Sequence, residues 1–221
     1  MNQLIDIFRG LDWSVLTDMV LSVIPALICI TVHEFCHGLS AYMLGDNTAK
    51  NMGRLTLNPL RHLDVMGLLM MAVFKFGWAK PVPVNPRNFK DEKRGMVITA
   101  LAGPLSNIVL AALMMVLYGI LWRVFGPRTY IPFETILTTA YLSTALAIFN
   151  LLPIPPLDGS KVFFGLLLSD DRYSDLLRYE QYGKVLLLLL VWRGVINRPL
   201  SAATAFVFEK LTRIALLFMR G

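Results

Sequence analysis

The chain has 221 residues, of which 56% are hydrophobic and only 16% charged. Soluble domains carry about 25% charged residues, so this composition excludes an ordinary soluble domain and indicates an integral membrane protein. The net charge of +6 does not indicate a nucleic-acid partner, because the basic residues cluster in loops beside apolar segments. We expect an all-α polytopic membrane protein with about 4–5 transmembrane helices in a lipid bilayer.

The first predicted helix covers residues 15–44 and ends at a turn, Gly45-Asp46-Asn47. His33, Glu34 and His37 lie inside it. Two histidines four apart face the same way on a helix, which is the spacing that holds zinc in hydrolases, and the glutamate between them can take a proton from zinc-activated water. Ionisable groups at membrane depth cost about 2.5–3.5 kcal/mol each, so they usually mark function. We expect one zinc ion per chain.

The segment between residues 45 and 95 has a mixed composition. Residues 54–58 and 80–86 alternate polar and apolar side chains and end in Asn-Pro, which predicts two short strands. Residues 65–76 are apolar but too short to span a membrane. The segment therefore predicts a small membrane-associated β-hairpin with a re-entrant or interfacial stretch.

Further apolar helices follow along the chain, and the last of them is either another span or an amphipathic helix at the membrane surface. They are expected at residues 95–124, 133–152, 160–168, 182–196 and 200–220. The sequence thus predicts one membrane-embedded domain over residues 1–221, with a catalytic core at about 15–165 and C-terminal helices at 180–220.

The distribution of charge predicts how the chain is oriented. Residues 45–95 contain nine basic and four acidic side chains, whereas the loop between the second and third spans carries two arginines. The positive-inside rule places 45–95 in the cytoplasm and His37 roughly 10 Å below that face. The third span ends on the same side and brings Asp158 there. We expect a multi-pass protein of the inner (cytoplasmic) cell membrane, with its active site toward the cytoplasm.

A catalytic zinc takes three protein ligands, and the residues alone do not decide which side chain is the third. Asp158 follows the turn Pro153-x-Pro155-Pro156, whose prolines make the backbone rigid, and it precedes a glycine, which permits a close approach. This position suits a metal ligand, although Asp158 could instead cap the next helix. His62 could be a ligand or could anchor a loop. The candidates for the third ligand are His62, Asp158, Cys36 and Asp64.

Asn107 is a polar amide inside the second span. It could hydrogen-bond between helices, or it could donate to the oxyanion that develops on a scissile carbonyl.

Three motifs in this order resemble the site-2 protease family of intramembrane zinc metalloproteases. They are His33-Glu34-x-x-His37, Gly103-Pro104-x-x-Asn107 and Asn150-Leu151-Leu152-Pro153-x-Pro155-Pro156-Leu157-Asp158-Gly159. The match spans about residues 15–165, and the chain is most similar to short prokaryotic members, with no room for PDZ or CBS domains.

The resemblance implies zinc held by His33, His37 and Asp158, with Glu34 as general base and Asn107 as a substrate or oxyanion contact. It implies hydrolysis of a peptide bond within or near the transmembrane helix of membrane-anchored protein substrates. A catalytically silent membrane scaffold and a membrane zinc-binding or transport protein are the alternatives. The oligomeric state does not follow from the sequence.

Overall fold

A computed structural model describes residues 13–64, 66–67, 79–126, 130–169 and 180–220. All the regular structure in this part of the chain is helical. The long α-helices are α2 (Trp13–Met43), α5 (Glu92–Phe125), α6 (Tyr130–Asn150), α7 (Asp158–Leu167), α9 (Glu180–Trp192) and α10 (Asn197–Arg220). The short elements are α3 (Thr48–Asn51) and the 3-10 helices η1 (Pro59–Arg61) and η2 (Pro86–Asn88). The all-α prediction is confirmed for these residues.

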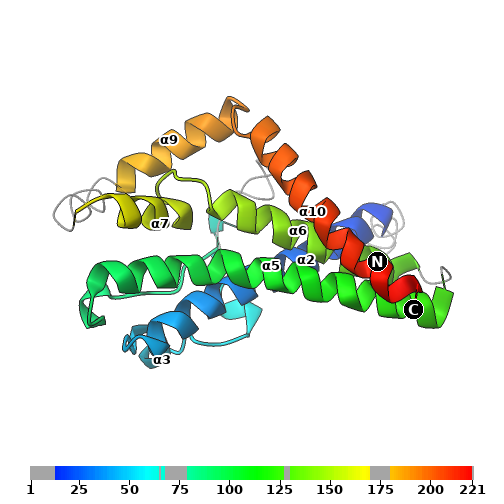
Figure 1. The fold of residues 1–221 in the computed structure, drawn as a ribbon, viewed down its shortest axis with the longest axis horizontal. Coiled ribbons are helices and arrows are strands. Elements are labelled where there is room, and N and C mark those ends of the chain that lie inside the picture. Colours follow the sequence, from blue (N-terminus) through cyan, green and yellow to red (C-terminus); the bar gives the residue numbers. More distant parts are fainter. Residues whose placement is uncertain (1–12, 65, 68–78, 127–129, 170–179, 221) are drawn as a thin grey trace, which may run out of the picture.

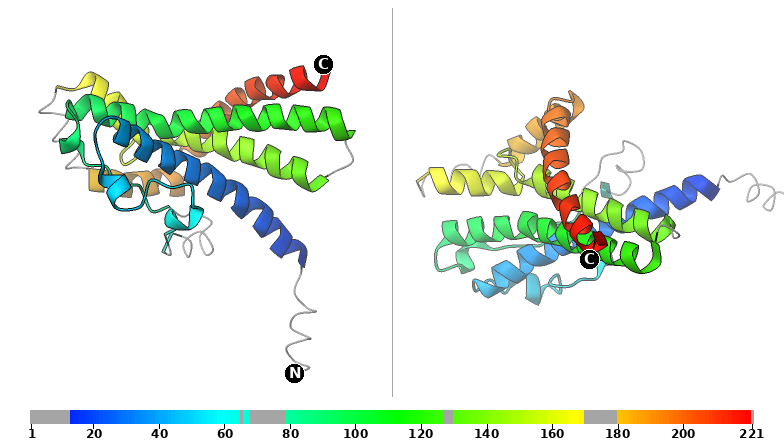
Figure 2. Two further views of the ribbon diagram at one scale, coloured as in Figure 1. Left: turned by 90° about the horizontal axis from the view of Figure 1, so that it is seen from below. Right: turned by 45° about the vertical axis from the view of Figure 1, so that its right-hand side comes forward.

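Helix α5 is the centre of the molecule, and α2, α6, α7 and α10 all pack against it (Figure 1). Figure 2 shows α2, α6 and α10 running beside α5 on different sides. A glycine in α5 allows α10 to approach closely, because a Cβ on Gly119 would lie 2.6 Å from the carbonyl oxygen of Ala215 in α10. The buried core here consists of small or flexible side chains, as is usual between packed membrane helices: Ala111, Met115, Ala140, Leu211 and Ala215.

Two helices are long and apolar enough to cross a membrane by themselves, namely α5 and the Val23–Met43 part of α2. The pair α9–α10, from Tyr182 to Met219, passes the same test only as one broken span bent by 85°. Helix α6 is not among the candidates found in the described residues. The described helices thus include two or three candidate spans, as expected for a membrane protein.

The predicted β-hairpin is wrong for the described residues, since neither 54–58 nor 80–86 forms a strand. The second segment cannot offer a regular ladder, because prolines remove backbone donors at three of its positions, 81, 83 and 86. Its carbonyls are also occupied, since those of Lys80 and Pro81 accept hydrogen bonds from the Arg54 side chain. Residues 66–67 are the only part of the predicted re-entrant stretch that lies within the described residues.

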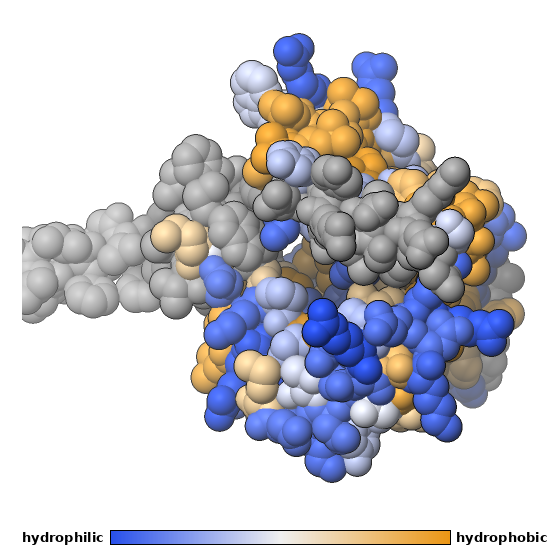
Figure 3. Space-filling view, turned by 90° about the vertical axis from the view of Figure 1, so that its left-hand side faces the viewer, coloured by the Kyte–Doolittle hydropathy of each residue, from blue (hydrophilic) through white to orange (hydrophobic). Residues whose placement is uncertain are grey.

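One end of the molecule is strongly hydrophilic. Figure 3 views the end at which α3 lies and α5 begins, and hydrophilic side chains cover its lower half. The exposed basic residues of this region are Lys50, Lys80, Arg87, Lys90 and Arg94. This end therefore cannot lie in the hydrocarbon core of a bilayer.

The loop between η1 and α5 is tied to the end of α2 by Asp46, whose side chain is fully buried. Its carboxylate accepts hydrogen bonds from the backbone N–H groups of Thr48 and Asn85, at 3.0 and 2.7 Å, and from Asn88 Nδ2 at 2.7 Å. Burial raises the pKa of Asp46, but these hydrogen bonds outweigh burial and hold the pKa below its usual range. The ionised carboxylate thus fixes residues 85–88 against α2.

We predict that Asp46→Asn lowers the free energy of unfolding at neutral pH by about 1–3 kcal/mol, because the charged acceptor is lost. The pKa of Asp46 in the folded protein lies below its value of about 3.9 in the unfolded chain. The stabilisation is therefore fully present above about pH 3.9 and is lost as the pH falls through the folded-state pKa. Thermal unfolding in detergent should show a gap between wild type and Asp46→Asn that closes at acid pH. The exposed Glu92→Gln change should leave the melting temperature unaltered, and a gap independent of pH would contradict this account.

Candidate metal centre

Helix α2 carries the two histidines one turn apart, and both are buried. The apolar residues around them keep α2 helical through this region, and helical spacing then points both imidazoles to one side. The two ring planes are nearly perpendicular, at 89°, and their centroids lie 4.5 Å apart. The Nε2 atoms of His33 and His37 are 3.0 Å apart, so the two rings offer their outer nitrogens to one point.

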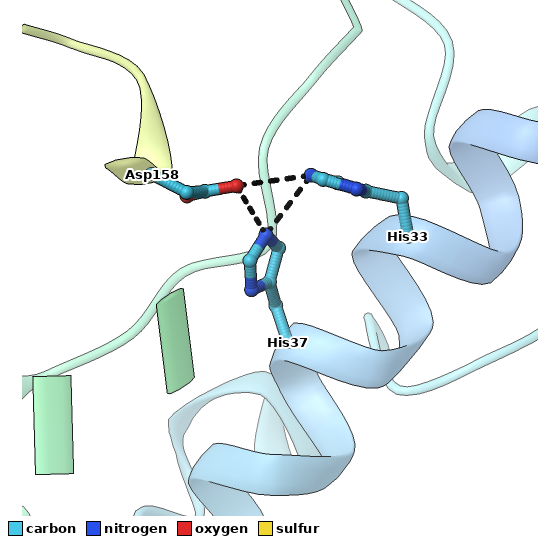
Figure 4. A group of neighbouring side chains, drawn as sticks. All are labelled: His33, His37 and Asp158. Carbon is cyan, nitrogen blue, oxygen red and sulfur yellow. Dashed lines mark hydrogen bonds and ion pairs between the residues drawn. The ribbon is translucent and has the colours of Figure 1, made fainter. Parts of the chain in front are cut away.

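Asp158 is the first residue of α7 and reaches the histidines from the opposite side (Figure 4). Its side chain does not cap the helix, because the N-cap position is Leu157 and no side chain caps the backbone there. Asp158 Oδ2 lies 3.2 Å from His33 Nε2 and 3.1 Å from His37 Nε2. The proline-rich turn before α7 therefore aims this carboxylate at the histidine pair.

Two glycines allow these backbones to come so close. A Cβ on Gly103 of α5 would collide with His37 Nε2 and would lie 2.7 Å from His33 Cε1. A Cβ on Gly159, next to Asp158, would collide with the carbonyl group of Leu151. Any side chain at either position would therefore push the donor groups apart.

The orientation of His37 is fixed by a hydrogen bond from its other ring nitrogen. Its Nδ1 lies 2.6 Å from the carbonyl oxygen of Thr99 in α5. A carbonyl oxygen can only accept, so Nδ1 carries the proton and Nε2 keeps a free lone pair toward His33 and Asp158. His33 Nδ1 is buried without a hydrogen-bond partner in the described part of the chain.

Glu34 lies beside the three donor atoms but is not one of them. Its Oε2 accepts a hydrogen bond of 2.7 Å from the backbone N–H of Val82, in the loop that follows η1. No hydrogen bond engages Oε1 within the described residues.

Asn107 lies one helical turn after Gly103, on the same side of α5. It is fully buried, and neither Oδ1 nor Nδ2 has a hydrogen-bond partner among the described residues. Its backbone carbonyl accepts from Ser143 of α6 at 2.8 Å. Unpaired buried amides are rare, so the Asn107 side chain points to a partner other than the described residues.

The other candidates for a third ligand lie elsewhere. His62 is buried, and its Nε2 donates to the carbonyl oxygen of Thr56 at 2.8 Å, so it anchors its own loop. Asp64 accepts from the backbone N–H of Gly67 at 2.8 Å. Cys36 is half-buried and does not belong to the group. Among the described residues, His33, His37 and Asp158 are the only group that could hold a metal ion.

The donor set fits zinc. Two imidazole nitrogens and one carboxylate oxygen form a typical catalytic zinc site that keeps a fourth position open. Ligands of a tetrahedral zinc lie about 3.3 Å from one another, and the three atoms here are separated by 3.0 to 3.2 Å. A small shift apart would therefore seat the ion.

Comparison with known proteins agrees with this geometry. The model of peptidase family M50 matches residues 128–191, a stretch that includes Asp158. A protein of Bacillus subtilis (strain 168) with the name "Putative zinc metalloprotease YwhC" is 40% identical over 173 residues, which cover 76% of this chain and 78% of that protein. The chain belongs to peptidase family M50, the site-2 protease family.

Other relatives of this M50 chain carry similar names. "Putative zinc metalloprotease Rip2" of Mycolicibacterium smegmatis is 31% identical over 179 residues, covering 78% of this chain and 66% of that protein. "Putative zinc metalloprotease MJ0611" of Methanocaldococcus jannaschii is 34% identical over 100 residues, covering 44% of this chain and 49% of that protein. No solved structure gives a significant match. The M50 chain is a zinc metalloprotease, and its cofactor is zinc.

Sequence reasoning missed three parts of this M50 site: the Val82 N–H, the Thr99 carbonyl and the role of Gly103. A signal existed for Val82, because the prolines on either side leave its N–H as an isolated donor. Gly103 belongs to the Gly103-Pro104-x-x-Asn107 motif, but the motif does not reveal that this glycine packs against the two imidazole rings. Nothing in the sequence marks the Thr99 carbonyl, since every residue has one.

We predict that Gly103→Ala abolishes stoichiometric zinc binding, because the added methyl group would occupy the space of the two imidazole rings. Metal analysis of the purified protein should give clearly less than one zinc per chain. Leu105→Ala, two residues along on the exposed side of α5, is the control and should retain zinc. A fully zinc-loaded Gly103→Ala protein would contradict the packing described here.

Proposed function

We propose that this chain is an intramembrane protease, which hydrolyses a peptide bond within or near the transmembrane segment of membrane-anchored protein substrates. The observation that carries the proposal is the convergence of His33, His37 and Asp158 beside Glu34, with both histidines on a helix long and apolar enough to cross a membrane. A soluble protease would not need such a site between apolar helices. A polar cluster in this setting is costly and is expected to serve chemistry.

In this proposal His33, His37 and Asp158 hold the zinc ion. Zinc, when bound, supplies Lewis-acid chemistry that makes water a nucleophile near neutral pH and polarises a carbonyl. The Thr99 carbonyl keeps His37 in the tautomer whose Nε2 is free. Such a partner also makes the imidazole a better ligand.

Glu34 is the general base. Because Val82 N–H holds Oε2, Oε1 is the atom that takes a proton from the attacking water and later passes it to the leaving amine. The proposal therefore needs only one carboxylate oxygen for proton transfer and uses the other for orientation.

Asn107 is the proposed contact to the substrate. Its buried, unpaired Nδ2–H groups can donate to a scissile carbonyl as negative charge develops on the oxygen. The peptide carbonyls of a substrate helix are already hydrogen-bonded within the helix. A substrate must therefore unwind locally before its carbonyl can reach this amide.

The charge of the hydrophilic end supports an orientation in the inner (cytoplasmic) membrane with this end, and the active site, toward the cytoplasm. We propose that α2, α5 and α6 span and that the bent α9–α10 pair forms one further broken span, giving about four in total. In this view residues 1–221 form one membrane-embedded domain, with the catalytic core at about 15–165 and the helices of 180–220 packed on it.

We predict that Glu34→Gln retains one zinc per chain but loses cleavage by a factor of about 10²–10⁴, the usual contribution of a general base. Comparative membrane proteomics of wild-type and Glu34→Gln cells should reveal a membrane-anchored precursor that accumulates in the variant. Glu92→Gln, an exposed carboxylate at the start of α5, is the control. Unchanged processing in Glu34→Gln cells would overturn the proposed mechanism.

A further inference from the structure

We propose that Arg54 is a positioning residue for Glu34, acting through the backbone N–H of Val82. The inference rests on the proposed function, because it takes Glu34 to be the general base. It goes beyond that function by assigning a task to a buried arginine that lies outside the metal centre.

The link begins at the isolated donor of residue 82. Pro81 and Pro83 have no N–H, so Val82 supplies the only donor between Lys80 and Val84, and this donor is 2.7 Å from Glu34 Oε2. The direction of that N–H depends on the peptide plane between Pro81 and Val82. Whatever holds the Pro81 carbonyl therefore also aims the Val82 N–H.

Arg54 holds that carbonyl. Its Nη2 donates to the carbonyl oxygens of Lys80 and Pro81, at 2.8 and 3.2 Å. The Pro81 carbonyl and the Val82 N–H belong to the same rigid peptide unit and point in opposite directions. One peptide unit therefore joins the guanidinium on one side to the Glu34 carboxylate on the other.

The burial of Arg54 is costly, which argues for a specific task. Its side chain is only 7% exposed, and no ion pair with a carboxylate is found for it in the described ranges. Its Nε is buried without a hydrogen-bond partner there. A solvated lysine or a small polar residue would avoid this desolvation, which here is offset by the two hydrogen bonds from Nη2 to the carbonyls of Lys80 and Pro81.

The surroundings make the arrangement stiff. Lys80 N donates to the carbonyl of His62 at 2.9 Å, and His62 Nε2 is bonded to the carbonyl of Thr56. Gly38 lies one turn beyond Glu34 on α2, and Val82 packs against it. A Cβ on Gly38 would be 3.1 Å from Val82 Cγ1. The loop that carries Arg54 and the loop that carries Val82 are thus locked together against α2.

The test uses the full chain, purified in detergent, and a panel of fluorophore–quencher peptides that each contain an apolar segment of about 20 residues. Arg54→Lys keeps the positive charge but loses the fork. It should lower kcat about 10- to 100-fold, as loss of supporting hydrogen bonds around metal sites does, with KM and zinc content unchanged. Arg61→Lys, the same change at an exposed neighbour, should have no effect.

Val82→Pro removes the N–H itself and gives the decisive comparison. If Arg54 acts through this hydrogen bond, the double variant Arg54→Lys/Val82→Pro loses no more kcat than the worse single variant. Losses that multiply, or a zinc-loaded Val82→Pro protein with wild-type kcat, would overturn the proposal.

A measurement without turnover keeps the inference testable if Arg54→Lys is inactive for other reasons. In ¹⁵N-valine-labelled protein, the Val82 amide proton should move upfield by a similar amount in Arg54→Lys and in Glu34→Gln, since both weaken a charge-assisted hydrogen bond. An unmoved resonance in Arg54→Lys would refute the link.

If Glu34→Gln is inactive while Arg54→Lys and Val82→Pro are normal, only this inference fails. If Glu34→Gln cleaves normally, the proposed function fails.

Discussion

The structure depends on one steric constraint, which is that three metal-donor groups from two helices distant in sequence must meet in the protein interior. His33 and His37 come from α2, and Asp158 comes from the start of α7, more than a hundred residues later. Gly103 lets α5 lie directly against the two imidazole rings, and Gly159 lets the start of α7 pack against the backbone of Leu151 and Leu152. Both histidines are buried, and a setting of low dielectric strengthens the interactions among these groups.

A second layer of hydrogen bonds surrounds the donors and uses the backbone more than side chains. The Thr99 carbonyl orients His37, and the Val82 N–H orients Glu34. Backbone groups carried by packed helices and stiff prolines have little freedom, so they hold their targets without the entropy cost of long side chains. Asp46 and Arg54 contribute as buried charges that pin the loop between η1 and α5. In the proposed mechanism, these contacts give a preorganised base beside a preorganised metal site.

The helices could be predicted from the sequence because apolar runs of this length have few alternatives in a membrane. The meeting of Asp158 with the histidines could also be expected, since loop charges place both on one side. The strands at 54–58 and 80–86 were predicted wrongly, because polar–apolar alternation does not reveal that the backbone groups are used by Glu34 and Arg54 instead of a neighbouring strand. Contacts made by backbone atoms leave little trace in a sequence.

Zinc X-ray absorption spectroscopy of the purified wild-type protein tests the central claim most directly, because it reads the ligand atoms without requiring a substrate. The account predicts four-coordinate zinc with two imidazole nitrogens and oxygen ligands at about 2.0–2.2 Å, and no sulfur. The Asp158→Ala variant should lose the carboxylate contribution while the imidazole signal persists in any zinc that remains bound. A sulfur shell at about 2.3 Å, which would assign Cys36 as a ligand, or a spectrum unchanged by Asp158→Ala would contradict it.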